Sequence, residues 1–124
     1  MKGKFQSDKP IYLQIVDQVI QEIVSNKRKK GDKLPSVREF AIDLGVNPNT
    51  IQRVYRELES RGMAISRRGQ GTFVTEEQEM ITKWKEKLKE RYIYDFIEAM
   101  EALGYSLEEI KENMMDEKWG GGDS

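Results

Sequence analysis

The sequence predicts a mainly α-helical protein with one small β-hairpin wing, in which a winged helix-turn-helix domain is followed by a helical hairpin. Three observations lead to this prediction. Two short amphipathic helices meet at a glycine turn, a glycine-rich hairpin follows them directly, and the formal charge changes sign near residue 75. We therefore expect one domain over residues 1–75, a helical segment over residues 76–118 and a flexible tail over residues 119–124.

The first helix is expected to begin at Pro10 and to end near Val24. Proline is favoured in the first turn of a helix because its missing N–H would have no partner there. Apolar residues then recur at spacings of three and four, as on one buried helix face: Tyr12, Ile15, Val16, Val19, Ile20 and Ile23. The polar, basic segment 25–33 follows, and it fits either a solvated loop or a contact with phosphate.

Two further helices carry clear end signals. Ser36 and Glu39 form a capping box at the start of the second helix, and Gly45 allows a left-handed turn at its end. Asn47 is the expected N-cap of the third helix, with Pro48 at its first position. The apolar faces are expected at Val37, Phe40, Ala41 and Leu44 in the second helix and at Ile51, Val54, Tyr55 and Leu58 in the third. Two such helices joined at a glycine form a helix-turn-helix.

A β-hairpin is expected immediately after the third helix. Gly62 ends that helix, and two short strands follow over residues 63–67 and 72–74. Gly69 and Gly71 lie in the short connection, where they supply the positive φ angles that a hairpin turn needs. A hairpin in this position is the wing of a winged helix.

Residues 76–103 are expected to form one long helix with an apolar stripe, which Gly104 ends. Ser106 and Glu109 form a second capping box, which starts a last helix through Ile110 and Met114. The stripe is longer than a small N-terminal core can cover, so we expect it to hold a homodimer together. Its predicted members are Ile81, Trp84, Leu88, Tyr92, Phe96, Met100 and Leu103.

Composition narrows the class of function. Residues 1–75 carry 14 basic against 8 acidic side chains, and residues 76–124 carry 7 against 14, so only the first part suits a polyanion. The chain contains neither Cys nor His, which removes disulfides and the commonest metal ligands, and we predict no metal and no cofactor. No apolar run approaches the ~18 residues of a membrane span, and the N-terminus has no secretory signal. We expect a cytoplasmic protein with no membrane partner.

The polar side of the third helix points to double-stranded DNA. Asparagine, glutamine and arginine bond in pairs to base edges or phosphates, whereas an ordinary solvated face would favour Glu and Lys. On the helix these residues are Asn49, Gln52, Arg53 and Arg56, with Thr50 at their flank. The wing adds Arg67, Arg68, Gly69, Gln70, Gly71 and Thr72, and the two helix starts add Ser36, Arg38 and Asn47. Arg38 fits a phosphate contact and an exposed salt bridge equally well.

Three motifs in this order resemble the DNA-binding domain of GntR-family regulators: residues 34–41 (LPSVREFA), 44–51 (LGVNPNTI) and 69–74 (GQGTFV). The resemblance covers about residues 10–75, and the short helical segment behind it is most similar to the YtrA subfamily, in which two helices replace the larger effector domain. Arg38, Thr50 and wing residues 69–72 match the family's DNA contacts. Many members carry Arg where this chain has Pro48 and Gln52, so those base contacts do not transfer.

We therefore expect a transcription regulator, acting as a repressor, that binds a palindromic operator as a homodimer. The alternative is a winged helix used for architectural DNA binding or for protein contacts. An enzyme is disfavoured because the carboxylates are spread along helix surfaces and no phosphate loop or activated nucleophile is present. The stripe around Trp84, Tyr92 and Phe96 could instead line the pocket of a small-molecule effector, against the simpler interpretation of helix packing.

Overall fold

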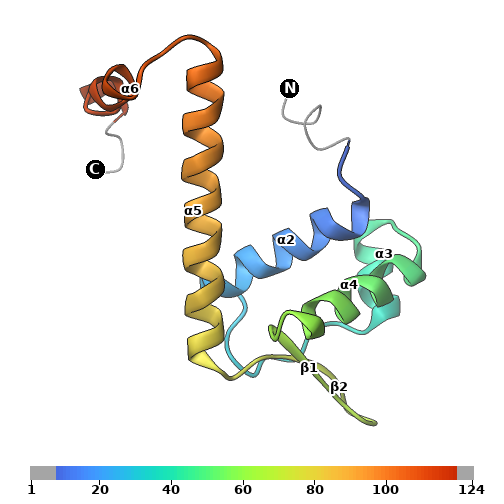
Figure 1. The fold of residues 1–124 in the computed structure, drawn as a ribbon. Coiled ribbons are helices and arrows are strands. Elements are labelled where there is room, and N and C mark those ends of the chain that lie inside the picture. The colour runs from blue at the N-terminus through green and yellow to red at the C-terminus, as the bar shows by residue number, and fades with distance from the viewer. Residues whose placement is uncertain (1–7, 120–124) are drawn as a thin grey trace. The chain divides into compact units, whose positions relative to one another are not determined.

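The computed structural model describes residues 8–119 and divides into two compact units, one ending at Lys85 and the other beginning at Glu86 (Figure 1). In chain order the elements are α2 (Ile11–Val24), α3 (Val37–Leu44), α4 (Pro48–Ser60), β1 (Ala64–Arg67), β2 (Gly71–Val74), α5 (Gln78–Ala102), α6 (Leu107–Met114) and the 3-10 turn η1 (Glu117–Trp119). The predicted mainly helical fold with a β-hairpin is present. Of the predicted tail, residues 120–124 lie outside the described residues, whereas Trp119 ends η1.

The predicted helix ends are confirmed by their hydrogen bonds. The Ser36 hydroxyl oxygen accepts from the Glu39 N–H at 3.1 Å, and the Glu39 carboxylate accepts from the Ser36 N–H at 3.1 Å. Gly45 ends α3 in the left-handed conformation at φ 68°. The Asn47 side-chain oxygen accepts from the Asn49 N–H at 2.7 Å and so caps α4. These caps set the turn between the two helices of the helix-turn-helix.

The core of the first unit lies where α4 contacts α2, α3 and β1. The buried apolar side chains come from every element around it: Ile15, Val16, Val19, Ile20, Ile23, Leu34, Phe40, Ala41, Ile51, Val54, Tyr55, Leu58, Met63, Ala64 and Val74. One detail of the predicted α3 face is wrong, because Leu44 in the last turn is 38% exposed. Only Phe40 and Ala41 of this short helix are buried.

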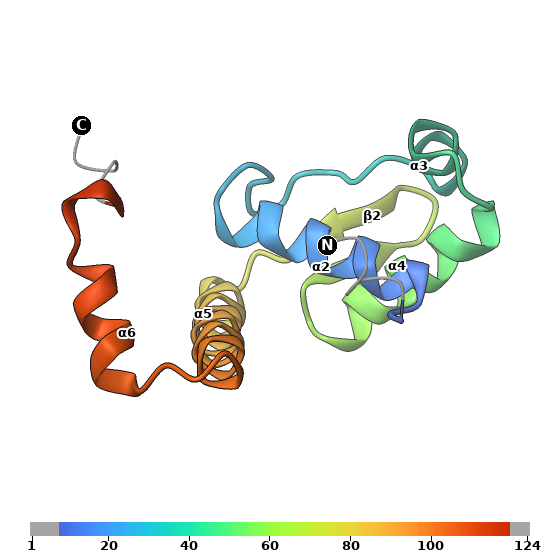
Figure 2. The ribbon, with the colours of Figure 1, turned by 90° about the horizontal axis from the view of Figure 1, so that it is seen from above.

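A third segment of the chain pairs with the wing, and the sequence analysis did not predict it. β1 and β2 pair antiparallel from Ala64 opposite Val74 to Arg67 opposite Gly71. The segment before α3 runs along the other edge of β2, where Lys33 pairs with Phe73 (Figure 2). The Leu34 N–H donates to the Thr72 carbonyl at 2.8 Å, and the Val74 N–H donates to the Asp32 carbonyl at 2.8 Å. The wing is therefore tied on both sides to the helical part of the unit.

The second unit contains the later turns of α5, a turn at Gly104, and α6 with η1. The predicted capping box of α6 is present, with the Ser106 oxygen accepting from the Glu109 N–H at 3.1 Å and the Ser106 N–H donating to the Glu109 carboxylate at 2.8 Å. Leu88 and Ile110 are its buried apolar residues. Among the described helices, none is long and apolar enough to cross a bilayer.

Candidate nucleic-acid interface

The candidate interface centres on α4, whose two sides differ completely. Its apolar stripe is buried at Ile51, Val54, Tyr55 and Leu58. The opposite side exposes the four predicted base-reading side chains, Asn49, Gln52, Arg53 and Arg56, while Thr50 is half-buried. Within residues 8–119, the side chains of Gln52 and Arg56 make no hydrogen bond or ion pair, so their donors and acceptors are open to a ligand.

A buried tyrosine fixes the orientation of α4. The Tyr55 hydroxyl donates to the Pro35 carbonyl at 2.6 Å, and its ring stacks on Phe40 with centroids 6.2 Å apart. Burial raises the pKa of Tyr55 to about 12, opposed by the nearby Arg28 charge and reinforced by Glu39. The phenol therefore stays neutral and keeps donating, which ties α4 to the loop before α3.

Arg53 does not project freely from α4. Its guanidinium lies 4.0 Å from the ring centroid of Tyr12 on α2, in a cation–π contact. The contact restricts the side chain to a few orientations while its charge stays exposed. The role of Arg53 in base reading stays a prediction. Tyr12, which the sequence pattern assigned to the core alone, is the residue that restricts the Arg53 side chain.

The wing presents a cationic tip. Gly69 and Gly71 adopt φ angles of 75° and 118°, and the Gln70 N–H closes the turn on the Arg67 carbonyl at 2.8 Å. Arg68 and Gln70 are exposed at this turn. Arg67 is partly engaged, because its guanidinium lies 5.0 Å from the Phe73 ring centroid and 3.9 Å from the Glu76 carboxylate. Arg68 is therefore the wing arginine more available to DNA.

Lys33 is a candidate contact that the sequence analysis placed only in a polar loop. Its side chain passes over Gly71, where a Cβ would lie 2.9 Å from the Lys33 Cε. Its exposed charge is thereby placed on the wing beside the predicted contacts. The signal in the sequence was weak, since only the pairing of residue 33 with Phe73 brings it there.

The basic residues before Lys33 have two different roles. Arg28 pairs with Glu22 at 2.7 Å and lies 5.7 Å from the Phe40 ring centroid, so it stabilises the fold. Lys27, Lys29 and Lys30 have exposed side chains, as a solvated loop or a phosphate contact requires.

At the start of α3, Ser36 and Arg38 are both exposed, and the Ser36 oxygen is used by the capping box. Asn47 likewise uses its side-chain oxygen as a cap. Thr72 is half-buried in β2, and its hydroxyl lies 3.5 Å from that of Ser66. Ser66 is in turn linked to α4, because its N–H donates to the Glu59 carboxylate at 3.0 Å. The helix start, the polar face of α4 and the wing therefore belong to one connected unit.

The predicted dimerisation stripe divides into two parts. Ile81 and Leu88 are buried within the single chain, and the Trp84 indole N–H donates to the Arg61 carbonyl at 3.1 Å. Further along, Tyr92, Phe96 and Leu103 are 47%, 43% and 73% exposed, and Met100 is half-buried. Ile93 and Tyr94 are also exposed, which the stripe pattern missed because it follows one helix face. The run YIYDFI at 92–97 was the available signal, since it is apolar on several sides.

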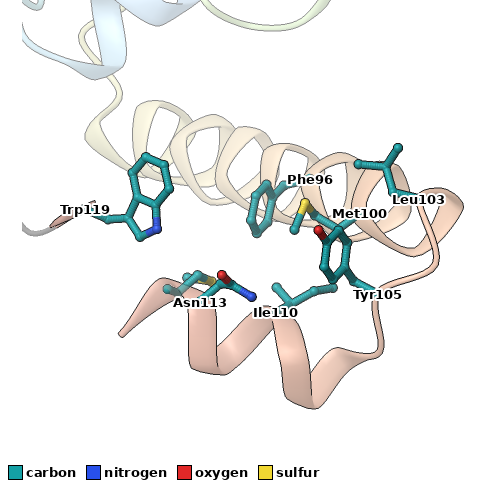
Figure 3. Close-up of a pocket in the computed structure, with 8 residues that line it drawn as sticks. Phe96, Met100, Leu103, Tyr105, Ile110, Asn113 and Trp119 are labelled. Atoms are coloured by element: carbon teal, nitrogen blue, oxygen red, sulfur yellow. The ribbon is translucent and has the colours of Figure 1, made fainter. Parts of the chain in front are cut away.

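The second unit also contains an apolar groove of about 650 Å³ (Figure 3). Phe96 and Met100 of α5 face Tyr105 and Ile110 across it. Leu103, Asn113, Met114 and Trp119 complete its lining. Within the described part of the chain, no group of three or more carboxylates could hold a metal ion.

Comparison with known proteins gives consistent matches. Residues 11–74 match the family model described as bacterial regulatory proteins, gntR family. The chain is 49% identical over 114 residues to YhcF, an uncharacterized HTH-type transcriptional regulator of Bacillus subtilis (strain 168), over 92% of this chain and 94% of that protein. It is 39% identical to the HTH-type transcriptional repressor YtrA of the same organism, over 93% of this chain and 92% of that protein. A solved GntR family regulator from Listeria monocytogenes superposes with a TM-score of 0.80 at 41% identity, over 86% and 94%.

Proposed function

This chain belongs to the gntR family of bacterial regulatory proteins, and we propose that it represses transcription as a homodimer bound to a palindromic operator. The family and the relatives are transcriptional regulators, so the chain is a DNA-binding transcriptional regulator and not an enzyme. The winged helix-turn-helix and the likeness to YtrA that the sequence predicts are confirmed. Chromosomal DNA as the partner would place its action in the cytoplasm.

The two sides of α4 carry the proposal. A helix whose apolar side is fully buried presents its other side in a fixed orientation, and here that side displays Asn49, Gln52 and Arg56. These side chains offer the paired donors and acceptors that distinguish bases in the major groove. The wing, with Arg68 at its tip, then contacts the adjacent backbone or minor groove.

Repression is supported by one relative in particular. YtrA, which matches over nearly the whole of both chains, is named a transcriptional repressor. A compact protein whose operator overlaps a promoter excludes RNA polymerase by occupying the DNA. We propose this simple mode of action for the present chain.

A second copy is the proposed occupant of the exposed apolar surface in the second unit. Tyr92, Ile93, Tyr94 and Phe96 form an apolar belt around α5, and the groove beside Phe96 opens next to it. Soluble monomers rarely expose such contiguous apolar patches. Two copies related by a two-fold axis would each cover the belt of the other and place two recognition helices on two half-sites.

Charge along α5 favours an antiparallel pairing of the two helices. Lys87 and Arg91 precede the middle of the belt on one flank, and Asp95 and Glu98 follow it on the same flank, at helical spacing. An antiparallel pair brings the basic end of one helix to the acidic end of the other. A parallel pair would bring like charges together.

The proposal is tested by selecting bound duplexes from random DNA with the full-length protein. The selected sequences should contain an inverted repeat, and sedimentation at tens of micromolar should give a dimer. A footprint on the promoter of the protein's own operon should cover both halves of the repeat. Selection of a single, non-repeated half-site by a sedimenting monomer would contradict the homodimer, while leaving DNA binding by the first unit in place.

A small-molecule effector is the second candidate occupant of the groove. A volume of about 650 Å³ lies in the ordinary range of ligand pockets, and Tyr105 and Asn113 bring polar groups to an apolar lining. An effector there would raise the melting temperature and change operator affinity at constant protein concentration. Tyr105→Ala should abolish both responses and leave operator affinity without the compound unchanged.

A further inference from the structure

Three successive contacts attach the segment that follows the recognition helix to α5 and to the residues just before it. The Thr75 N–H donates to the Met63 carbonyl at 2.9 Å. Gly62, with φ 78°, faces Met80, and a Cβ on it would lie 2.9 Å from the Met80 Cε. The chain after α4 therefore lies directly against the start of α5.

The third contact joins Trp84 to the C-cap of α4. The Trp84 indole N–H donates to the Arg61 carbonyl at 3.1 Å, and the Arg61 guanidinium lies 5.1 Å from the indole ring centroid. Arg61 also pairs with Glu57 in the last turn of α4 at 2.9 Å. Carbonyl groups at a helix end need a partner outside the helix, and here a side chain of α5 supplies one.

The attached face of α5 is continuous with the rest of the helix. Met80 and Trp84 are four residues apart, so they share one face, and the neighbouring Ile81 is buried. No Gly or Pro interrupts α5 between Gln78 and Ala102. Sharp bends in helices arise mainly at such residues, so the sequence of α5 contains no usual site for a sharp bend after its attached end.

We propose that Trp84 is a positioning residue that holds the first turns of α5 against the recognition helix α4. The inference rests on the proposed homodimer: when a second copy holds the two α5 helices together, the Trp84 contact on each side sets the separation of the two α4 helices. The protein then reads the spacing between half-sites as well as their sequence. Trp84 acts here through α4 and contacts no DNA itself.

The experiment measures operator affinity as a function of half-site spacing. Duplexes carry the selected inverted repeat with its natural spacer or with one or two added base pairs. Each added pair rotates one half-site by about 34° and moves it by about 3.4 Å. The proteins are the full-length wild type, Trp84→Ala, Trp84→Phe and the matched control Lys83→Ala, which changes an exposed neighbour on the same helix. A duplex with a single half-site measures reading by α4 alone.

The wild type and Lys83→Ala should lose about tenfold or more in affinity with one added pair, because the dimer or the DNA must deform. Trp84→Ala should lose less than about threefold, since its two reading heads are no longer held at one separation. Trp84→Phe keeps an aromatic ring without the indole N–H, and its spacing profile should be flatter than that of Lys83→Ala. Affinity for the single half-site should be equal in all four proteins.

A Trp84→Ala protein that keeps the wild-type spacing profile overturns the inference and leaves the homodimer standing. If Trp84→Ala does not fold, Trp84→Phe decides in the same way. A merely structural role would lower affinity for every spacer and for the single half-site alike, which also overturns it. A flat profile in the wild type also overturns the inference, and sedimentation then decides separately whether the homodimer stands.

Discussion

The two units of this protein contain similar proportions of apolar residues but bury them to very different extents. In the first unit the apolar stripes of α2 and α4 are buried together with Phe40 and Ala41 of α3, and the exposed surface of α4 carries Asn, Gln and Arg. Among the described residues of the second unit only Leu88 and Ile110 are buried, while large apolar side chains stay exposed around α5 and α6. The first unit completes its own core, and in the proposed homodimer the second unit covers its apolar surface with a partner. This difference separates the reading of DNA from assembly.

The largest expected effect comes from charging the exposed belt. Phe96→Glu places a carboxylate in the proposed dimer interface, where an unpaired charge cannot be accommodated. We expect a monomer by sedimentation and a loss of about a hundredfold or more in operator affinity, because one of two reading heads is lost. Phe96 lies outside the first unit, so affinity for a single half-site should not change.

Glu90→Gln, on the same helix, is the control for Phe96→Glu. It changes an exposed side chain without adding charge to the belt, and it should leave the dimer and the operator affinity nearly unchanged. A dimeric Phe96→Glu protein with wild-type affinity would remove the distinction between a self-sufficient and a partner-dependent unit.

The sequence predicts features held by local contacts better than features held by contacts between distant segments. The caps at Ser36, Asn47 and Ser106 are local hydrogen bonds between residues two or three apart, so the helix boundaries could be predicted closely. The pairing of Lys33 with Phe73 joins residues far apart in the chain, and no local pattern announces it.

The candidate site shows the same limit at single residues. Exposure of Asn49, Gln52 and Arg56 followed from helical spacing, because the opposite stripe is buried. The engagement of Arg53 by Tyr12 and of Trp84 by Arg61 could not be predicted, since spacing assigns a helix face and not its neighbour. Trp84 was assigned to the dimer stripe for this reason, although its indole bonds within the first unit.

The next largest loss of operator affinity is expected when a side chain of α4 that is predicted to contact bases is removed. Asn49→Ala removes a side chain that can pair with adenine, and it should cost about 1–3 kcal/mol on the best operator and weaken base preference at one position of each half-site. Binding to a panel of operators with single-base changes measures this. Sedimentation should still give a dimer, because Asn49 lies in the first unit. Equal losses on every operator in the panel would assign Asn49 to phosphate instead.

A smaller effect is expected on the stability of the first unit. Tyr55→Phe removes the hydrogen bond to the Pro35 carbonyl and should lower the free energy of unfolding by about 1 kcal/mol. Denaturant titration measures it, with Tyr94→Phe on an exposed tyrosine as the matched control. Because the pKa of Tyr55 is raised to about 12, the phenol is protonated in the folded state well above neutral pH. The difference between Tyr55→Phe and wild type should therefore not vary between pH 6 and pH 9.

Arg38→Ala tests the predicted phosphate contact at the start of α3. It should weaken all operators by a similar few-fold factor, because phosphates carry no base sequence. The slope of log affinity against log salt should become shallower by about 0.9 per monomer, or roughly 2 for the dimer. Glu39 is unsuitable as a control because it caps α3, so Asp43→Asn on the same helix is used. An unchanged slope would show that Arg38 does not contact phosphate.

The smallest expected effect tests the antiparallel pairing of α5 through charge. One variant carries Lys87→Glu, Arg91→Glu, Asp95→Lys and Glu98→Lys together, so the basic and acidic ends of its helix flank are exchanged. In an antiparallel pair each homodimer keeps opposite charges together, whereas a mixed dimer of variant and wild type meets like charges at both ends. A parallel pair would reverse this and favour the mixed dimer. Exposed pairs contribute only about 0.2–1 kcal/mol each, so the preference against the mixed dimer should be modest and should fade at high salt. Native mass spectrometry of an equimolar mixture at low salt measures the share of mixed dimer, which should fall below the statistical half. A share of one half at every salt concentration would place these four side chains away from the interface, and the exposed belt would then have to pair in another direction.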